Sequence, residues 1–348
     1  MKANVLYGIG DLRYVDVPMP EVAEGQVLLK VRAVGICGSD NARVFKTGTY
    51  HFPTIIGHEF SGEVVQAEDR QLVGRRAAVY PLIPCGKCDS CKRSVFETCS
   101  HYNYLGSRCD GAFAEYVAVP IWNLAFLPDK VTDEEAAMLE PSCVAYHALR
   151  RSGFAFGDTV AVFGPGTIGM ILCMLARMAG AKKVFLIGRT QEKLDFARQN
   201  GIVEDVCNSS ETDIEEWINE ATDGKGVDIA FEGTGASATL EHCLLITRPL
   251  GTVLAMGNPQ GDMVLGKDAY WKLLRKQLRM IGTWNSSFGS YPDDWKSVID
   301  LLEQGRLPLA KLITHRLALP DLIKGLEMMH EKSEYCNKIM IINNGQEG

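Results

Sequence analysis

Four cysteines within one short stretch of the chain can bind a metal ion without help from any other segment. They follow the spacing C-x2-C-x2-C-x7-C, at Cys85, Cys88, Cys91 and Cys99. Four thiolates suit a tetrahedral Zn²⁺ ion and leave no coordination position open. The turn-forming and basic residues between them would bend the loop and offset the negative charge. The spacing predicts a structural zinc site; the alternative is a chance cluster of reduced thiols.

A second set of metal-binding residue types is spread over the first 140 residues. Cys37 lies in GICGSD, and His58 and Glu59 lie in GHEFSG. Glu140 lies in LEPSCVAYHAL. One thiolate, one imidazole and one carboxylate, with the fourth position open to water, would form a catalytic zinc site. Taken singly, each has an ordinary alternative: a buried thiol, a hydrogen-bonded core histidine or a charge at a helix end.

A glycine-rich turn, GPGTIG at 164–169, lies between an apolar run at 159–163 and a helical pattern at 167–178. In G-x-G-x-x-G the glycines allow a tight turn and close approach of the backbone to a pyrophosphate, and the helix N-terminus supplies N–H groups. The pattern predicts dinucleotide binding; the alternative is a purely structural turn. The contacts are expected from Gly164, Gly166, Thr167, Ile168 and Gly169.

The end of the next strand bears on which dinucleotide binds. An NAD-binding strand usually ends in Asp or Glu, which holds the ribose 2′-hydroxyl. Here Gly188 takes that place and Arg189 follows, with Thr190 and Lys193 nearby. A guanidinium can pair with a 2′-phosphate that a carboxylate would repel. We therefore expect NADP to be preferred over NAD. In the alternative, Arg189 stacks on adenine or faces solvent in an NAD enzyme.

The elements that must position these residues fall into two groups. Short β patterns at 27–34, 62–65 and 77–80 predict an all-β, barrel-like domain over residues 1–148. A helical segment at 293–304 and a strand-like one at 338–342 suggest that residues 286–348 return to it. The catalytic domain would then be split.

Between these parts, strand and helix patterns alternate, which predicts a doubly wound parallel sheet over 149–285. The expected strands are 159–163, 183–187, 228–232, 251–256 and 279–282. The expected helices are 167–178, 191–199 and 238–247.

Composition narrows the classes of partner. The 348 residues carry a net charge of −7, which argues against nucleic acid or an anionic membrane as partner. The N-terminal sequence has no sustained apolar run, so we expect neither a signal peptide nor a membrane span. Eleven cysteines without export features indicate reduced thiols and a cytoplasmic protein.

Several motifs occur in a fixed order: CGSD, GHExxG, the four-cysteine segment, GSRxDGAFAEY and an EP pair before the second domain. Together they resemble the zinc-dependent medium-chain alcohol and polyol dehydrogenase family over essentially the whole chain. The resemblance implies an α/β protein with a GroES-like β-barrel catalytic domain, a zinc lobe at about 85–99 and a Rossmann domain. It implies two Zn²⁺ ions per chain.

By motif match, Cys37, His58 and Glu140 would hold the catalytic zinc, and Glu59 would exchange on and off it. Ser39 resembles the hydroxyl that begins proton release; its alternative role is to cap a helix starting near Asp40. The histidine that completes the relay in many relatives is absent, so the proton would leave through water or Glu59.

The resemblance also implies contacts outside the metal site. Thr283 and Asn285 would lie near the nicotinamide carboxamide, and Lys338 would reach the pyrophosphate. A homodimer or homotetramer is expected, with a small-molecule polyol or sugar phosphate as substrate.

Glu140, where many alcohol dehydrogenases of the family have cysteine, points to the polyol branch. There, HYNYLGSRCDGAFAEY and IGTWNSS are most similar to enzymes acting on substrates such as galactitol 1-phosphate. Candidate cations for the phosphate are Arg43, Lys46 and Arg108. The alternatives are a dehydrogenase of non-phosphorylated polyols or simple secondary alcohols, a zinc-free quinone reductase and a non-catalytic dinucleotide-binding protein.

Overall fold

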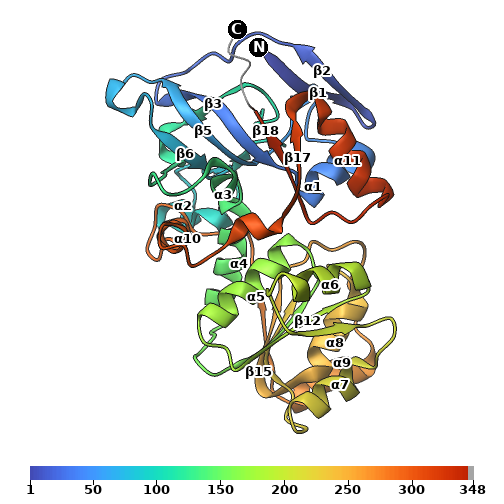
Figure 1. The fold of residues 1–348 in the computed structure, drawn as a ribbon. Helices are drawn as coiled ribbons and strands as arrows, with labels where there is room; N and C mark the ends of the chain where they lie inside the picture. The colour runs from blue at the N-terminus through green and yellow to red at the C-terminus, as the bar shows by residue number, and fades with distance from the viewer. Residues whose placement is uncertain (344–348) are drawn as a thin grey trace. The chain divides into compact units, whose positions relative to one another are not determined.

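The structure, a computed structural model, describes residues 1–343 (Figure 1). Contacts divide the chain into two compact units, one containing Met1–Cys143 and the chain from Ser286 onward, the other Val144–Asn285. Helix α4 (Leu139–Arg151) runs across the first division, and the boundary expected at 148/149 stays a prediction. In the part of the chain that the structure describes, no helix has both the length and the apolar character needed to cross a membrane.

The first unit is built mainly of β-structure around a seven-stranded sheet. Its order is β10-β6-β5-β3-β18-β17, with β9 also paired to β3. The strands are β3 (Gln26–Gly35), β5 (Glu59–Gln66), β6 (Arg76–Val79), β9 (Tyr116–Pro120), β10 (Leu124–Phe126), β17 (Ile313–Ala318) and β18 (Lys338–Ile342). Strand β3 is central and runs antiparallel to β5, β9 and β18. The return of the C-terminal segment to this unit follows from the pairing of β18 with β3.

Two smaller sheets and several short helices complete the first unit. The sheets have the orders β2-β1-β4 and β7-β8. Their strands are β1 (Lys2–Gly8), β2 (Asp11–Asp16), β4 (Thr54–Ile55), β7 (Leu82–Ile83) and β8 (Asn103–Tyr104). The α-helices are α1 (Gly38–Ala42), α2 (Asp89–Lys92), α3 (Asp133–Ala137), α10 (Asp294–Glu303) and α11 (Leu322–Glu331). The single-turn helices are η1 (Arg43–Thr47), η2 (Arg70–Leu72), η3 (Phe96–Thr98), η4 (Ile121–Asn123), η5 (Leu309–Leu312) and η6 (Leu319–Asp321).

The core of the first unit explains why β3 is at the centre of the sheet. The β3 residues Leu29, Val31 and Val34 are buried, and they belong to the same core cluster as Phe60 and Phe113. Hydrophobic burial of this kind supplies most of the driving force for folding. The predicted β-rich domain is confirmed.

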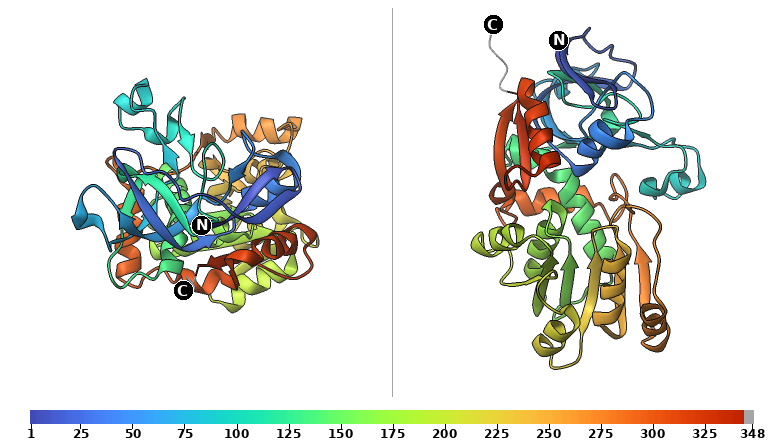
Figure 2. Two further views of the ribbon diagram at one scale, coloured as in Figure 1. Left: turned by 90° about the horizontal axis from the view of Figure 1, so that it is seen from above. Right: turned by 90° about the vertical axis from the view of Figure 1, so that its right-hand side faces the viewer.

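The second unit is a six-stranded parallel sheet flanked by helices (Figures 1 and 2). The strand order, β13-β12-β11-β14-β15-β16, is the doubly wound order 3-2-1-4-5-6. The strands are β11 (Thr159–Phe163), β12 (Lys183–Gly188), β13 (Asp205–Asn208), β14 (Val227–Glu232), β15 (Thr247–Ala255) and β16 (Arg279–Gly282). The helices are α5 (Thr167–Met178), α6 (Gln191–Gln199), α7 (Ile214–Ala221), α8 (Ser237–Ile246) and α9 (Lys267–Arg275).

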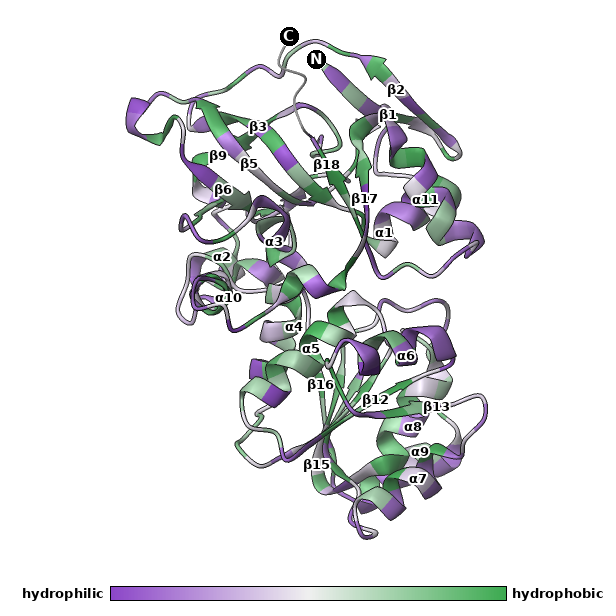
Figure 3. Cartoon of the chain, viewed as in Figure 1, coloured by the Kyte–Doolittle hydropathy of each residue, from purple (hydrophilic) through white to green (hydrophobic). Residues whose placement is uncertain are grey.

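Strands β11, β12 and β14 are largely buried, and Figure 3 shows that β12 is mostly hydrophobic. This is why β11, β12 and β14 could be predicted from continuous apolar runs. Strand β13 and helices α7 and α9 were not predicted. β13 has four residues and begins with an aspartate, and α9 leaves Tyr270 and Trp271 exposed. β13 is too short to show a period, and the exposed aromatic residues of α9 obscure the i, i+4 pair Ala269 and Leu273 that packs on the core.

Candidate functional site

The four cysteines of segment 85–99 come together in the first unit. Their sulfur atoms all lie within 4.8 Å of one another. Cys88 Sγ lies 3.5 Å from Cys91 Sγ and 3.8 Å from Cys99 Sγ, and Cys85 Sγ lies 3.9 Å from Cys91 Sγ. In a tetrahedral centre with Zn–S bonds of about 2.3 Å, the sulfurs are about 3.8 Å apart. These residues therefore fit a structural zinc ion.

The local backbone of this lobe stabilises thiolates. Helix α2 begins directly after Cys88, and the N–H groups of Cys91 and Ser100 lower the pKa of Cys88 to about 5. Burial and the neighbouring thiols raise the pKa of Cys91 to about 12. Four thiolates this close repel one another, so their joint ionisation requires a bound cation.

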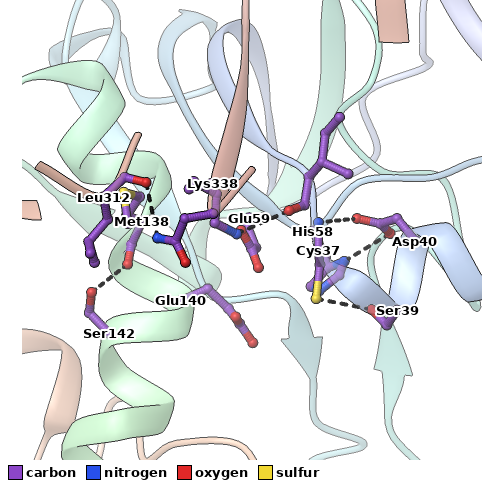
Figure 4. A network of polar contacts seen from close by, with 12 residues as sticks. Cys37, Ser39, Asp40, His58, Glu59, Met138, Glu140, Ser142, Leu312 and Lys338 are labelled. Carbon is purple, nitrogen blue, oxygen red and sulfur yellow. Dashed lines mark hydrogen bonds and ion pairs between the residues drawn. The ribbon is translucent and has the colours of Figure 1, made fainter. Parts of the chain in front are cut away.

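Cys37, His58 and Glu59 form a second cluster, with ligand atoms within 4.8 Å of one another (Figure 4). Cys37 follows the end of β3 and is the N-cap of α1, whereas Glu59 opens β5. In the antiparallel register Gly35 is opposite Glu59, which brings the end of one strand to the start of the other. A Cβ at Gly35 would lie 2.5 Å from Glu59 Oε2, so the glycine leaves room for the carboxylate.

Asp40 was missed by the sequence analysis, and it lies directly behind His58. It is fully buried, and its Oδ1 lies 3.3 Å from His58 Nδ1. It accepts hydrogen bonds from the Cys37 backbone N–H at 3.1 Å and from Arg43 Nη1 at 2.9 Å. Burial opposes ionisation of Asp40, but His58 and Arg43 hold its pKa below the usual range. The contact is an ion pair and not a well-aligned hydrogen bond, and a carboxylate beside Nδ1 favours Nε2 as the nitrogen available to a metal.

The electrostatics of His58 follow from the same contact. Although burial alone would lower it, Asp40 raises the pKa of His58 well above the ordinary value. Metal binding at the other ring nitrogen would displace a proton. The signal for Asp40 was present in CGSD, where it occupies the third helical position and closes a capping box with Cys37.

Ser39 lies in the first turn of α1, which begins at Gly38 rather than near Asp40. The Ser39 hydroxyl donates to Cys37 Sγ at 3.3 Å and accepts from Arg43 Nη1 at 3.1 Å. It therefore connects a guanidinium to the cluster and is not the helix cap.

Lys338 lies on β18 beside the cluster. Its Nζ donates to Glu59 Oε2 at 2.5 Å and to the Ile36 backbone oxygen at 3.1 Å. Both side chains are almost completely buried. Burial alone would lower the pKa of Lys338, but Glu59 and neighbouring acidic groups raise it. The structure gives this amino group a partner in the cluster, and its predicted contact with the pyrophosphate stays a prediction.

Glu140, on α4, lies outside the group of three (Figure 4). Its Oε1 accepts a hydrogen bond from the Tyr104 hydroxyl at 3.3 Å. Burial raises the pKa of Glu140 to about 7, and nearby His58 opposes this rise. Tyr104, also missed by the sequence analysis, has its ring centroid 5.8 Å from that of His58. Glu140 therefore lies beside the cluster, held by Tyr104, while Glu59 occupies the third place within it.

In the second unit the glycine-rich turn has the geometry that a pyrophosphate requires. Gly164 has φ = 106°, which glycine adopts readily. A Cβ at Gly169 would lie 2.1 Å from the Gly164 oxygen, so only glycine lets α5 pack this closely. A Cβ at Gly166, the N-cap, would meet nothing within 4 Å. The N-terminus of α5, with Thr167 and Ile168 in its first turn, fits a phosphate.

The predicted adenosine-side residues lie at the end of β12. Gly188 is its last residue, and a Cβ there would lie 2.4 Å from Pro165 Cγ. Arg189 and Thr190 are exposed, and Lys193 is partly exposed in the first turn of α6. Close packing on Pro165 therefore excludes an acidic side chain at position 188 and leaves Arg189 as the next available group.

The two residues predicted near the nicotinamide follow β16. Thr283 Oγ1 and Asn285 Oδ1 are buried and have no hydrogen-bond partner among the described residues. Asn285 has φ = 57°, a left-handed conformation that asparagine tolerates. Buried oxygens without partners are costly, and such groups are often satisfied by a ligand.

Two family models match parts of the chain. Residues 23–129 match the alcohol dehydrogenase GroES-like domain, and residues 167–304 match the zinc-binding dehydrogenase domain.

Two curated relatives extend over nearly the full length. Galactitol 1-phosphate 5-dehydrogenase from Escherichia coli K12 is 33% identical over 321 residues, covering 91% of this chain and 92% of that protein. D-arabitol-phosphate dehydrogenase from Enterococcus avium is 31% identical over 351 residues, covering 98% and 96%.

Three solved structures have the same fold. Galactitol-1-phosphate dehydrogenase from Escherichia coli has a TM-score of 0.92 at 30% identity, covering 98% of this chain and 100% of that one. A zinc-binding dehydrogenase from Sinorhizobium meliloti 1021, bound to NADP, has a TM-score of 0.88 at 29% identity and 98% coverage of both. An alcohol dehydrogenase from Escherichia coli CFT073, in complex with NADH, has a TM-score of 0.89 at 26% identity, covering 98% and 99%.

A GroES-like unit with metal-binding residue clusters, a doubly wound unit with a dinucleotide turn, and full-length relatives above 30% identity lead to one assignment. The chain belongs to the zinc-dependent medium-chain alcohol and polyol dehydrogenase family.

Proposed function

We propose that the chain reversibly oxidises a secondary alcohol of a polyol or polyol phosphate, such as galactitol 1-phosphate, to a ketone. The hydride passes from the alcohol carbon to a nicotinamide dinucleotide, and the hydroxyl proton leaves to solvent. The cluster of Cys37, His58 and Glu59, with Glu140 beside it, is the observation that carries the proposal. The names of two relatives, each a dehydrogenase of a polyol phosphate, support this substrate class.

A zinc ion held by Cys37, His58 and Glu140 would supply Lewis acidity that lowers the pKa of the substrate hydroxyl. The donor set suits it, because thiolate, imidazole and carboxylate are all zinc ligands. Glu59 would be the exchanging ligand. A second zinc ion, held by the four cysteines of the lobe, would leave no position open for substrate and serve the fold.

The chain's own residues give the proton a limited choice of routes. Ser39 accepts from Arg43 and donates to Cys37. The guanidinium of Arg43 donates hydrogen bonds and has no acceptor atom, so it cannot take the proton onward as a histidine would. Asp40 holds His58 in one orientation. The route that remains runs through water or through Glu59, which Lys338 contacts on its other side.

The test of this proposal is a panel of polyols and polyol phosphates assayed with NADP and NAD. Oxidation of a non-phosphorylated polyol or a simple secondary alcohol alone would favour the alternative substrate class. No oxidation of any secondary alcohol, with the zinc content complete, would contradict the proposal.

We propose NADP as the preferred dinucleotide, with Arg189 pairing with the 2′-phosphate. Replacing Arg189 by Ala is expected to lower kcat/KM with NADP by about 10- to 100-fold, because a charge-assisted bond is lost. With NAD the change should stay within a few-fold. Steady-state kinetics with both dinucleotides measure the ratio.

The matched control is Lys182→Ala, which removes an exposed cation just before the opposite end of β12. A wild-type enzyme that strongly prefers NAD would contradict the assignment of Arg189.

We propose a homo-oligomer in which β16 pairs with β16 of a second copy. Strand β16 is at the edge of the sheet, and Met280 on it is 45% exposed. Trp271, Leu274 and Trp284 add exposed apolar surface on the flanking elements. An exposed apolar edge strand is a template for pairing with another chain. We also propose a cytoplasmic location, because all eleven cysteines are outside disulfide bonds.

Replacing Met280 by Asp is expected to convert the oligomer to a smaller species, since each interface would bury two uncompensated carboxylates. Light scattering coupled to size-exclusion chromatography measures the mass. Phe156→Asp, at an apolar residue exposed elsewhere on the second unit, is the control and should leave the mass unchanged. A monomeric wild type would contradict this proposal.

A further inference from the structure

Three cations were candidates for reading a substrate phosphate, and the structure distinguishes them. Arg43 is already engaged, because its Nη1 lies 2.9 Å from Asp40 and 3.1 Å from Ser39. Its charge is therefore largely balanced by a buried carboxylate. Lys46 is an exposed side chain in the single-turn helix η1. Neither combines a free charge with a fixed position.

Arg108 is held differently, against two aromatic rings. Its guanidinium carbon lies 4.1 Å from the ring centroid of Tyr50 and 4.6 Å from that of Tyr102. Rings stack on the faces of the planar group and leave its N–H donors directed outward at the edge. Among residues 1–343, no side chain forms an ion pair or hydrogen bond with this guanidinium.

The backbone beneath Arg108 is also fixed. The Arg108 N–H donates to the Tyr104 oxygen at 2.9 Å, and its carbonyl oxygen lies 3.2 Å from His51 Nε2. The Tyr50 N–H donates to the Ser107 oxygen at 3.3 Å. The loop that carries Tyr50 is thus bound to the turn that carries Arg108, which fixes the two backbone segments relative to each other.

A row of aromatic rings connects this cation to the metal-binding cluster. The Tyr102 and Tyr104 ring centroids are 6.2 Å apart, and those of Tyr104 and His58 are 5.8 Å apart. All these residues belong to the first unit. In a polyol phosphate, the phosphate and the oxidised hydroxyl lie at different points along one carbon chain. A cation that binds the phosphate must therefore lie in the same unit as the metal-binding residues, and Arg108 is linked to them by this row of rings.

We infer that Arg108, in contact with the rings of Tyr50 and Tyr102, binds the phosphate of a polyol-phosphate substrate and selects it over the free polyol. This inference rests on the proposed function and deepens it. A guanidinium edge matches two phosphate oxygens at once, which an ammonium cannot do. In a chain with a net charge of −7, a local cation would offset the overall repulsion of an anionic substrate.

The experiment compares Arg108→Ala with the matched control Lys46→Ala, using the zinc-loaded enzyme. Arg108→Ala is expected to lower kcat/KM for galactitol 1-phosphate by about 10- to 100-fold. For galactitol and for the dinucleotide, the constants should change by less than about twofold, and Lys46→Ala should leave all three unchanged. Arg108→Lys should recover only part of the loss.

A second measurement does not depend on turnover of the phosphorylated substrate. Inorganic phosphate should inhibit galactitol oxidation competitively in the wild type, and its inhibition constant should rise by about tenfold in Arg108→Ala. Zinc content and Tm, equal to those of the wild type, would show that the variant is folded.

Four results would overturn the inference: an equal loss for galactitol and its phosphate, a change confined to the dinucleotide KM, the same loss in Lys46→Ala, or a wild type with no preference for the phosphate. In that last case oxidation of the free polyol would leave the proposed dehydrogenase intact. A wild type that oxidises neither compound nor any other secondary alcohol would remove the proposed function and this inference together.

Discussion

Replacing His58 by Ala is expected to abolish turnover while leaving the fold intact. His58 is buried, and it is the only imidazole in the cluster with Cys37 and Glu59. Without it, the open zinc site keeps too few ligands to hold the ion, and the Lewis acidity worth several kcal/mol is lost. We expect kcat/KM to fall by ~10³-fold or more. Metal analysis should show a fall from about two zinc ions per chain to about one.

The matched control is His101→Ala, at an exposed histidine outside both clusters. It should keep full activity and both zinc ions. Normal turnover or an unchanged zinc count in His58→Ala would show that the cluster is not the catalytic centre.

Zinc analysis can also distinguish the roles of the two carboxylates near His58, Glu59 and Glu140. If Glu140 is the permanent ligand, Glu140→Ala should lose the zinc ion as His58→Ala does. Glu59→Ala should then retain it with altered kinetics, because Lys338 would lose its buried partner. The reverse result would assign the permanent ligand to Glu59, which lies inside the cluster.

Much of the fold could be predicted, because its signals are local. The apolar run of β11 and the periodic apolar residues of α5 can each be recognised within a short window of sequence, and the glycines between them predict the turn. Strand β13 could not be predicted, since its four residues are assigned only by pairing with β12. Likewise, the exposed Tyr270 and Trp271 of α9 obscure its buried face, which Ala269 and Leu273 form.

The site shows the same limit. The lobe cysteines are close in sequence, and their spacing alone predicts their convergence. Asp40 and Tyr104 were missed because their roles depend on tertiary neighbours: Asp40 acts through His58, and Tyr104 acts through Glu140. Lys338 was predicted to reach the pyrophosphate, which stays a prediction, and its buried contact with Glu59 was not foreseen because it arises from the pairing of β3 with both β5 and β18. No local pattern reports such a contact.

The second large effect is expected in the lobe. There, a substitution should lower stability and leave catalysis intact, whereas His58→Ala should abolish catalysis and leave the fold intact. Replacing Cys91 by Ser removes a buried ligand from a four-sulfur centre. One zinc ion should be lost, and the Tm should fall by several degrees, because loss of a bound metal is among the most destabilising changes. The three remaining thiolates would repel one another without the ion. The catalytic zinc and kcat per folded enzyme should change little.

The base of the lobe explains how this loss would be seen. Phe96 packs against Trp122 with ring centroids 5.0 Å apart, and buried Glu97 accepts a hydrogen bond from Ser287 at 3.2 Å. Unfolding of the lobe would therefore change the fluorescence of Trp122 and expose segment 85–99 to proteases. Cys109→Ser, the same substitution at a cysteine outside both clusters, is the control and should keep the zinc, the fluorescence and the Tm. A zinc ion with four sulfur ligands has no free coordination position for substrate. Loss of turnover in Cys91→Ser with both zinc ions still bound would therefore contradict a purely structural role for the lobe.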